Sequence, residues 1–149
     1  MNNPYANSGY AKAMTAYQNT QDENLGPMEI ILELYKGVIK FLRQAKSAYE
    51  ADDLEKMCYW VDRVQKILEA LTAHLDMEQG GKDAEFLQEF YVVLIARLGK
   101  VLDRPDTSKE FDQLIAYAMP VYERWYELTY DRVAPGKEDA DVKESAHAN

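Results

Sequence analysis

The sequence predicts an all-α fold, an antiparallel up-down four-helix bundle. Apolar residues recur at steps of three and four along four long segments, which is the spacing of one helix face. Gly26-Pro27, Gly80-Gly81 and Pro105 fall at or near the ends of these segments, whereas Gly37 lies inside the first and Pro120 inside the last. Because the links between segments are only a few residues long, consecutive helices are expected to be antiparallel neighbours.

The four helices are predicted at residues 28–50, 53–77, 84–102 and 108–130. Pro27 suits an early position of the first helix, where its missing N–H costs nothing. Asp52 or Asp53 is the expected N-cap of the second helix. The Gly80-Gly81 pair is the expected stop after it.

The second helix carries the clearest seam of the bundle. Its apolar residues alternate steps of three and four without a break, which is the repeat of a left-handed bundle. They are Leu54, Met57, Val61, Val64, Leu68, Leu71 and Leu75. In the fourth helix, Thr107 or Ser108 is the expected cap. Pro120 predicts a kink there, because it removes the N–H that would reach the carbonyl of Ala116.

Both ends of the chain differ in composition from the bundle at residues 25–130. Residues 1–24 are polar and small apart from a few aromatic residues, which predicts a mobile or weakly docked N-terminal arm. Tyr10, Met14 and Tyr17 would share one side of a short helix in it. Residues 131–149 are charged and small without periodicity, which predicts a disordered acidic tail.

The charge balance and cysteine count exclude several classes of partner and compartment. A net charge of -9 and a pI near 4.7 argue against nucleic acid or an anionic membrane surface, because both repel an acidic protein. No run approaches the roughly 18 apolar residues that a membrane span needs, and no signal peptide is visible. A single cysteine, Cys58, excludes an internal disulfide. We therefore expect a cytoplasmic protein without membrane insertion.

The sequence predicts no enzyme, no metal site and no cofactor. A di-metal bundle needs Glu-x-x-His pairs, whereas neither His74 nor His147 has a glutamate three residues before it. His74 is expected to end a helix. Cys58 has no nearby histidine to activate it, so it is expected to be a buried small apolar residue. Gly80-Gly81 lacks the neighbours of a phosphate-binding loop.

The helices carry more apolar residues than one packing seam requires. Six of these residues are candidates for a partner-binding groove: Ile39, Trp60, Ile67, Phe86, Phe90 and Val93. A bundle core with wide apolar faces would also explain them, and helical phase alone leaves both readings open. As a groove, the six side chains would supply on the order of 10 kcal/mol before ordering costs. The partner would be another protein segment or a second copy of the chain.

Several motifs, taken in order, resemble the flagellar export chaperone family, the FliS-type proteins. The first are Tyr17-Gln-Asn-Thr20, Pro27 and the Leu-Tyr-x-Gly-x-Ile-x-Phe-Leu pattern within Ile30–Ala45. Those that follow are Leu75-Asp-Met-Glu-Gln-Gly-Gly81, Leu87-Gln-Glu-Phe-Tyr91, Arg97-Leu98 and Trp125. The resemblance covers most of residues 17–125. The chain departs from the family pattern at Lys36, at Phe86 and at the polar run 22–24.

The resemblance implies a cytoplasmic secretion chaperone. Such a protein binds the disordered C-terminal segment of flagellin in an apolar groove, prevents premature polymerisation and assists export. The family implies that the arm, with Tyr10, Met14 and Tyr17, covers part of the groove until flagellin arrives. Other flagellar export or regulatory proteins are further partners of this kind. The alternative is a self-associating structural or regulatory bundle, such as a homodimer, without a flagellin client.

Overall fold

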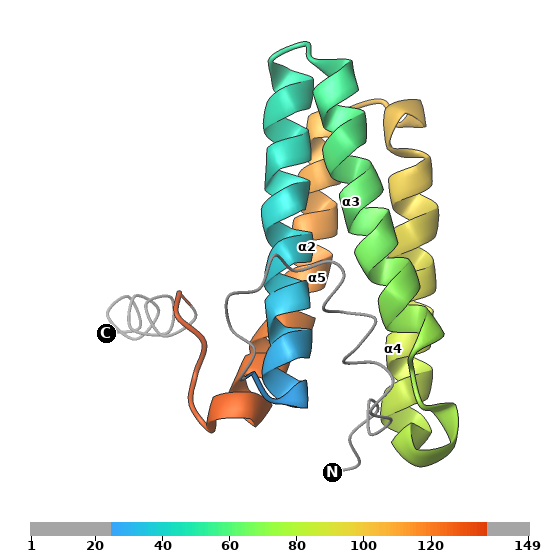
Figure 1. Cartoon of the computed structure of the whole chain (residues 1–149). Helices are drawn as coiled ribbons and strands as arrows, with labels where there is room; N and C mark the ends of the chain where they lie inside the picture. The colour runs from blue at the N-terminus through green and yellow to red at the C-terminus, as the bar shows by residue number, and fades with distance from the viewer. Residues whose placement is uncertain (1–24, 137–149) are drawn as a thin grey trace, which may run out of the picture.

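The computed structural model of the chain describes residues 25–136, and these form a bundle of helices with no strand among them (Figure 1). The elements are α2 (Pro27–Glu50), α3 (Leu54–Ala73), α4 (Met77–Gly99), the short 3-10 helix η1 (Val101–Asp103) and α5 (Thr107–Tyr130). The all-α four-helix fold expected from the sequence is thereby confirmed. Residues 1–24 lie outside the description, so the roles expected for Tyr10, Met14 and Tyr17 stay predictions.

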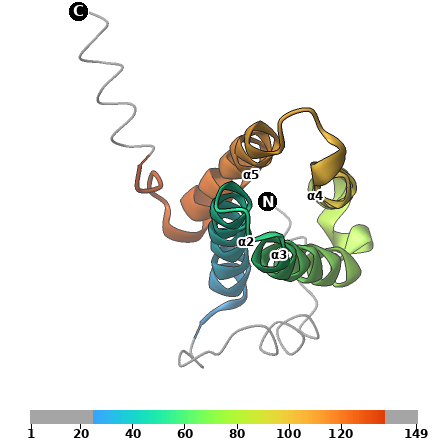
Figure 2. The same cartoon turned by 90° about the horizontal axis from the view of Figure 1, so that it is seen from above.

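Helix α2 packs along both α3 and α5, and α4 packs mainly against α3. Seen from above, α4 stands apart from α5, because α5 lies beside α2 whereas α4 lies beside α3 (Figure 2). The core contains nearly all of the apolar residues that follow steps of three and four along α2 and α4. Its residues with no more than 2% exposure include Ile31, Leu32, Val38, Leu42, Ala45, Leu68, Leu71, Tyr91, Leu94, Leu98, Phe111 and Leu114.

Two of the expected helix starts are as the sequence predicts. Pro27 occupies the first position of α2, directly after Gly26. Asp53 caps α3, because its carboxylate accepts a hydrogen bond from the Lys56 backbone N–H at 3.0 Å. A helix start leaves its first N–H groups unpaired. Asp53 satisfies one of them in α3, and Pro27 has no N–H to satisfy in α2.

The boundary between α3 and α4 differs from the prediction. Helix α3 ends at Ala73 with His74 as its C-cap, so His74 does end a helix as expected. Asp76 then caps α4 by accepting from the Gln79 N–H at 3.0 Å. The Gly80-Gly81 pair therefore lies inside α4 and is not a stop after α3. Gly81 has φ 56° and ψ −134°, which breaks the helix locally before the long part of α4 continues.

Helix α5 is capped by Asp106, whose carboxylate accepts from the Lys109 N–H at 3.1 Å, and not by the expected Thr107 or Ser108. The helix continues through Pro120, and Figure 1 shows it bending towards its C-terminal end. The bundle also extends beyond residue 130, because Ala134 is fully buried in the core. Residues 137–149, the rest of the tail that is expected to be disordered, lie outside the description.

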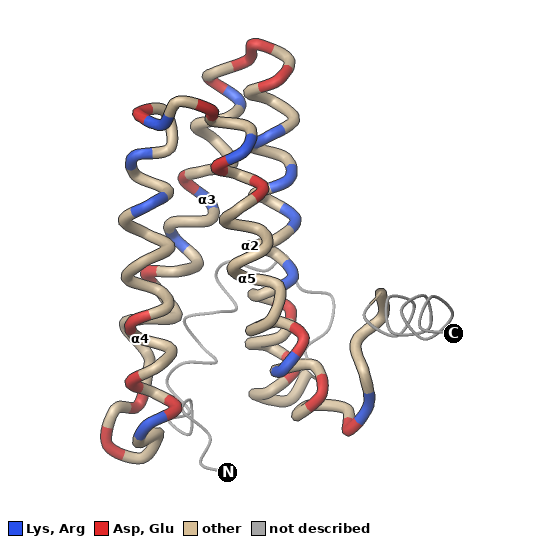
Figure 3. The backbone as a smooth tube through the Cα atoms, turned by 180° about the vertical axis from the view of Figure 1, so that it is seen from behind, with Lys and Arg blue, Asp and Glu red and all other residues tan. Residues whose placement is uncertain are grey.

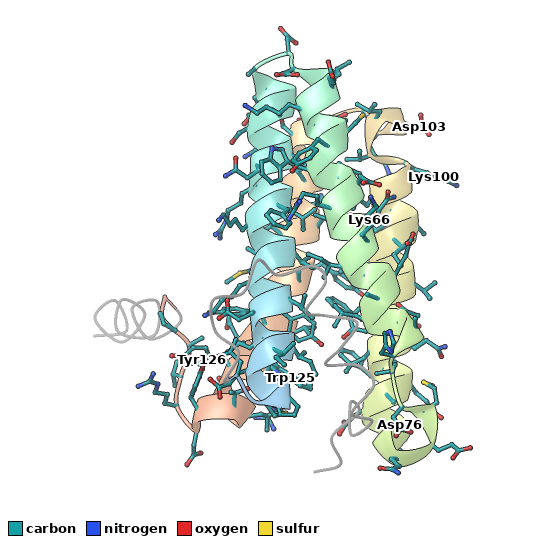
Figure 4. The ribbon with its side chains drawn as sticks, in the orientation of Figure 1. Lys66, Asp76, Lys100, Asp103, Trp125 and Tyr126 are labelled. Carbon is teal, nitrogen blue, oxygen red and sulfur yellow. The ribbon has the colours of Figure 1, made fainter. Side chains whose placement is uncertain are left out.

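Two buried polar contacts fix how the helices meet. The hydroxyls of Tyr35 and Tyr91 lie 2.6 Å apart and join α2 to α4 across the core. Trp125 of α5 donates its indole N–H to the Met28 carbonyl of α2 at 2.8 Å, near the end of the bundle labelled in Figure 4. Burial raises the pKa of Tyr35 above its usual range, and the hydrogen bond to Tyr91 opposes this only in part. The Tyr35 hydroxyl therefore stays protonated.

Candidate functional site

An aromatic surface formed by Phe86, Phe90 and Tyr117 lies between α4 and α5. Phe86 is 60% exposed and stacks on Phe90, with ring centroids 6.5 Å apart. Phe90 is 4% exposed, and its ring centroid lies 5.2 Å from that of Tyr117, which is 40% exposed. This α4–α5 surface therefore has a buried centre and two exposed edges, which suits it to receive an apolar side chain of a partner.

Helix α4 is tied to α5 mainly at the end near η1. Arg97 donates from Nε to the Glu110 carboxylate at 2.9 Å and from Nη2 to the Gln113 side-chain oxygen at 3.2 Å. The Thr107 hydroxyl donates to the Val101 carbonyl at 3.2 Å. Because Phe86 lies towards the other end of α4, these polar contacts leave the aromatic part of the interface without a comparable tie.

A second aromatic surface lies on α2 and α3, and we name it the α2–α3 surface. The rings of Phe41 and Trp60 stack with centroids 5.2 Å apart, and Tyr59 meets Trp60 edge-on at 4.9 Å. The Arg63 guanidinium lies 4.9 Å from the Phe41 ring centroid and 5.7 Å from that of Tyr59. Cation–π contacts of this kind hold the guanidinium flat on the aromatic side chains.

Gly37 completes the α2–α3 surface, because its missing side chain lets α3 approach α2. A Cβ at this position would lie 3.4 Å from Ile67 Cδ1 and 3.8 Å from the Phe41 ring. Gly37 itself is half-buried. The α2–α3 surface thus comprises Gly37, Phe41, Tyr59, Trp60, Arg63 and Ile67.

The six residues predicted for one groove do not lie on one surface of the bundle. Phe86 is exposed, Trp60 and Val93 are half-buried, and Ile39, Ile67 and Phe90 are at most 5% exposed within the chain itself. Trp60 and Ile67 belong to the α2–α3 surface, and Phe86 and Phe90 to the α4–α5 surface. Their role in binding stays a prediction.

Sequence reasoning missed Tyr59, Arg63 and Tyr117 as surface residues. Tyr59 and Arg63 are four residues apart on one helix, which places their side chains together, and this spacing was available as a signal. Tyr117 had no such signal, because its meeting with Phe90 depends on how α4 and α5 pack.

Cys58 is exposed, so the expectation that it is a buried apolar residue is wrong. It lines an open cavity of about 280 Å³ between α3 and the end of α4, together with Val61, Leu98 and Leu102. The described residues hold no cluster of three or more His, Cys, Asp or Glu side chains suited to a metal ion. Nor does any helix in residues 25–136 combine the length and apolar content that a bilayer crossing requires.

Charged side chains alternate in sign over the described surface, and Lys and Arg recur along α2 (Figure 3). Lys36 pairs with Glu33 at 3.0 Å and Lys46 with Asp112 at 2.8 Å. These exposed pairs contribute little to stability. A third pair joins Lys66 to Asp62 at 2.8 Å on α3. These three lysines of α2 and α3 therefore already have acidic partners.

The fold and its two aromatic surfaces define a helical-bundle protein suited to binding another chain. Comparison with known families gives a consistent result, because the family model described as "Flagellar protein FliS" matches residues 10–132. The chain belongs to the FliS family, whose members are flagellar chaperones and not enzymes. The suspected resemblance is therefore confirmed.

Two curated relatives support this assignment over most of their length, and a third supports it over part of its length. The chain is 29% identical over 116 residues to the "Flagellar secretion chaperone FliS" of Campylobacter jejuni, which is 78% of this chain and 90% of that protein. It is 30% identical over 118 residues to the "Flagellar secretion chaperone FliSB" of Pseudomonas aeruginosa, covering 76% and 93%. The Bacillus subtilis protein "Flagellar secretion chaperone FliS" matches at 37% identity over 62 residues, 42% of this chain and 47% of that protein.

Proposed function

We propose that the chain is a cytoplasmic flagellar secretion chaperone that binds the disordered C-terminal segment of flagellin. Binding keeps the flagellin subunit from polymerising before export and presents it to the export apparatus. The observation that carries this proposal is the exposed Phe86 side chain, which continues the aromatic cluster of Phe90 and Tyr117. The relatives described as flagellar secretion chaperones support a secreted flagellar client.

The α4–α5 surface supplies enough apolar area for such a contact. Burying large apolar side chains contributes roughly 1.5–3 kcal/mol each, counted for a side chain that goes from exposed to buried. Phe86 and Tyr117 are exposed enough to gain from this, and the half-buried Trp60 and Phe41 add a second contact area. A flexible client loses part of this gain in ordering, so these four side chains supply only part of the roughly 8 kcal/mol that a micromolar complex needs, and we expect further contacts along the client to supply the rest.

The test compares two aspartate variants on α4. Phe86→Asp places a charge on the α4–α5 surface, whereas Val92→Asp changes a 54% exposed apolar residue six positions later on the same helix, about 120° round the helix axis from Phe86. We expect calorimetry with a flagellin C-terminal peptide to show tight one-to-one binding by wild type and by Val92→Asp. Phe86→Asp should weaken binding at least tenfold with unchanged helical content.

The outcomes separate the competing functions. Equal binding by both variants would exclude the α4–α5 surface as the client site. No binding by wild type, together with a concentration-dependent dimer in sedimentation, would favour the self-associating bundle. In that case Phe86→Asp should dissociate the dimer, since the same exposed surface would then face a second copy.

A further inference from the structure

The Arg63 side chain has an unusual place on the α2–α3 surface. Its guanidinium lies over the Phe41 and Tyr59 rings, and Nη1 donates to the Tyr59 hydroxyl at 3.3 Å. Nε is buried and has no hydrogen-bond partner among the described residues. The neighbouring carboxylate of Asp62 pairs with Lys66 at 2.8 Å. Arg63 is therefore a cation without a carboxylate partner in the described part of an acidic chain.

The unpaired atoms lie on one edge of the guanidinium. Nη1 is taken by Tyr59, whereas Nε and Nη2 share the edge that binds a carboxylate through two parallel hydrogen bonds. No acceptor among the described residues reaches Nε. Because Nε is buried in the structure, a partner carboxylate must draw the side chain outwards slightly to engage both nitrogens.

We propose that Arg63 receives a side-chain carboxylate of the client segment, an Asp or Glu whose apolar neighbour packs on Phe41 and Trp60. This inference rests on the proposed function and assigns a specificity residue on the α2–α3 surface. The occupant follows from charge complementarity, since Arg63 offers a cation with an unpaired fork on an apolar surface. The surface continues past Arg63 on both sides, towards Tyr59 and towards Gly37, which lies beside Ile67. A bound segment therefore passes through, which favours a side chain over a terminal carboxylate.

The experiment is a double-mutant cycle measured by calorimetry with a synthetic peptide of the flagellin C-terminal segment. The chaperone variants are Arg63→Met, which keeps the apolar stem, and Arg63→Lys, which keeps the charge without the fork. The control is Lys100→Met, which removes an equal charge from an exposed residue at the C-terminal end of α4 (Figure 4). The peptide variants replace each Asp by Asn and each Glu by Gln, one at a time.

We expect Arg63→Met to weaken binding about tenfold, the usual effect of a charge-assisted contact, and Lys100→Met to leave it unchanged. One peptide replacement should weaken binding to wild type by the same factor and have no effect on Arg63→Met. Arg63→Lys should bind with intermediate affinity. Thermal unfolding should show that Arg63→Met still folds cooperatively, since the apolar stem is kept and no folded-state ion pair is lost, although its contacts with Phe41 and Tyr59 are removed.

Other results would overturn the inference. Wild-type affinity for Arg63→Met, or peptide replacements that act equally on both proteins, would remove the contact while leaving the client role intact. A peptide with an amidated C-terminus that alone reproduces the loss would assign Arg63 to the terminal carboxylate instead. Absence of any peptide binding by wild type would defeat the proposed function and this inference together.

Discussion

Replacing Gly81 by alanine tests whether the backbone break that starts the long part of α4 depends on glycine. Gly81 has φ 56° and ψ −134°, a combination close to a region that essentially only glycine occupies. An alanine Cβ at this position would meet no atom within 4 Å, so the substitution adds backbone strain without a clash. We expect Gly81→Ala to lower the free energy of unfolding by about 1–3 kcal/mol.

Gly99 provides a control with the opposite expected sign. It is the last residue of α4, and a Cβ there would lie 4.0 Å from the Gln65 side-chain nitrogen, which is an ordinary contact. Alanine restricts the unfolded chain more than glycine does and fits a helical backbone without strain. Gly99→Ala should therefore raise the free energy of unfolding by about 0.5–1 kcal/mol.

Urea denaturation followed by far-UV circular dichroism measures both variants. The midpoint should fall for Gly81→Ala and rise for Gly99→Ala, with unchanged slopes, since neither substitution alters the surface exposed on unfolding. Equal stability of Gly81→Ala and wild type would refute the strained conformation at Gly81. A loss of stability in both variants would instead indicate a general intolerance of added side chains around α4.

Two further substitutions test contacts of the core and of a helix end. Tyr91→Phe removes the partner of the buried Tyr35 hydroxyl, so denaturation should show a loss of about 1–3 kcal/mol, and adding Tyr35→Phe should restore part of it. Asp106→Ala removes the cap of α5 and should cost about 1 kcal/mol in the same assay, whereas Ser108→Ala should change stability little.

The sequence was sufficient for the fold because burial follows helical spacing. Leu87, Tyr91 and Leu98 lie on one face of α4, at spacings of four and seven residues, and all three are at most 5% exposed. The error at the start of α4 arose because two glycines normally end a helix, whereas here Asp76 caps a helix that passes through them. Two glycines widen the range of backbone conformations that are allowed at this point, but the surrounding contacts decide which one the chain adopts.

The candidate site was harder to predict, since helical phase gives the direction of a side chain but not what covers it. Phe86 and Phe90 lie one turn apart on the same stripe, yet Phe86 is 60% exposed and Phe90 only 4%. The difference comes from packing around Phe90, including the contact with Tyr117 of α5. The place of Arg63 over Phe41 and Tyr59 likewise depends on how α3 packs against α2, which helical phase does not give.

The charge distribution of the chain suggests how register and affinity are separated. A net charge of -9 repels an acidic partner at long range, so carboxylates on a client weaken the first encounter. At one position of the α2–α3 surface, Arg63 would attract a client carboxylate, because its Nε has no hydrogen-bond partner among the described residues. Apolar contacts with Phe86 or Trp60 are tolerant of sliding, whereas a two-point contact with a guanidinium is not. The aromatic surfaces would then supply affinity, and the Arg63 contact would select the register in which the segment binds.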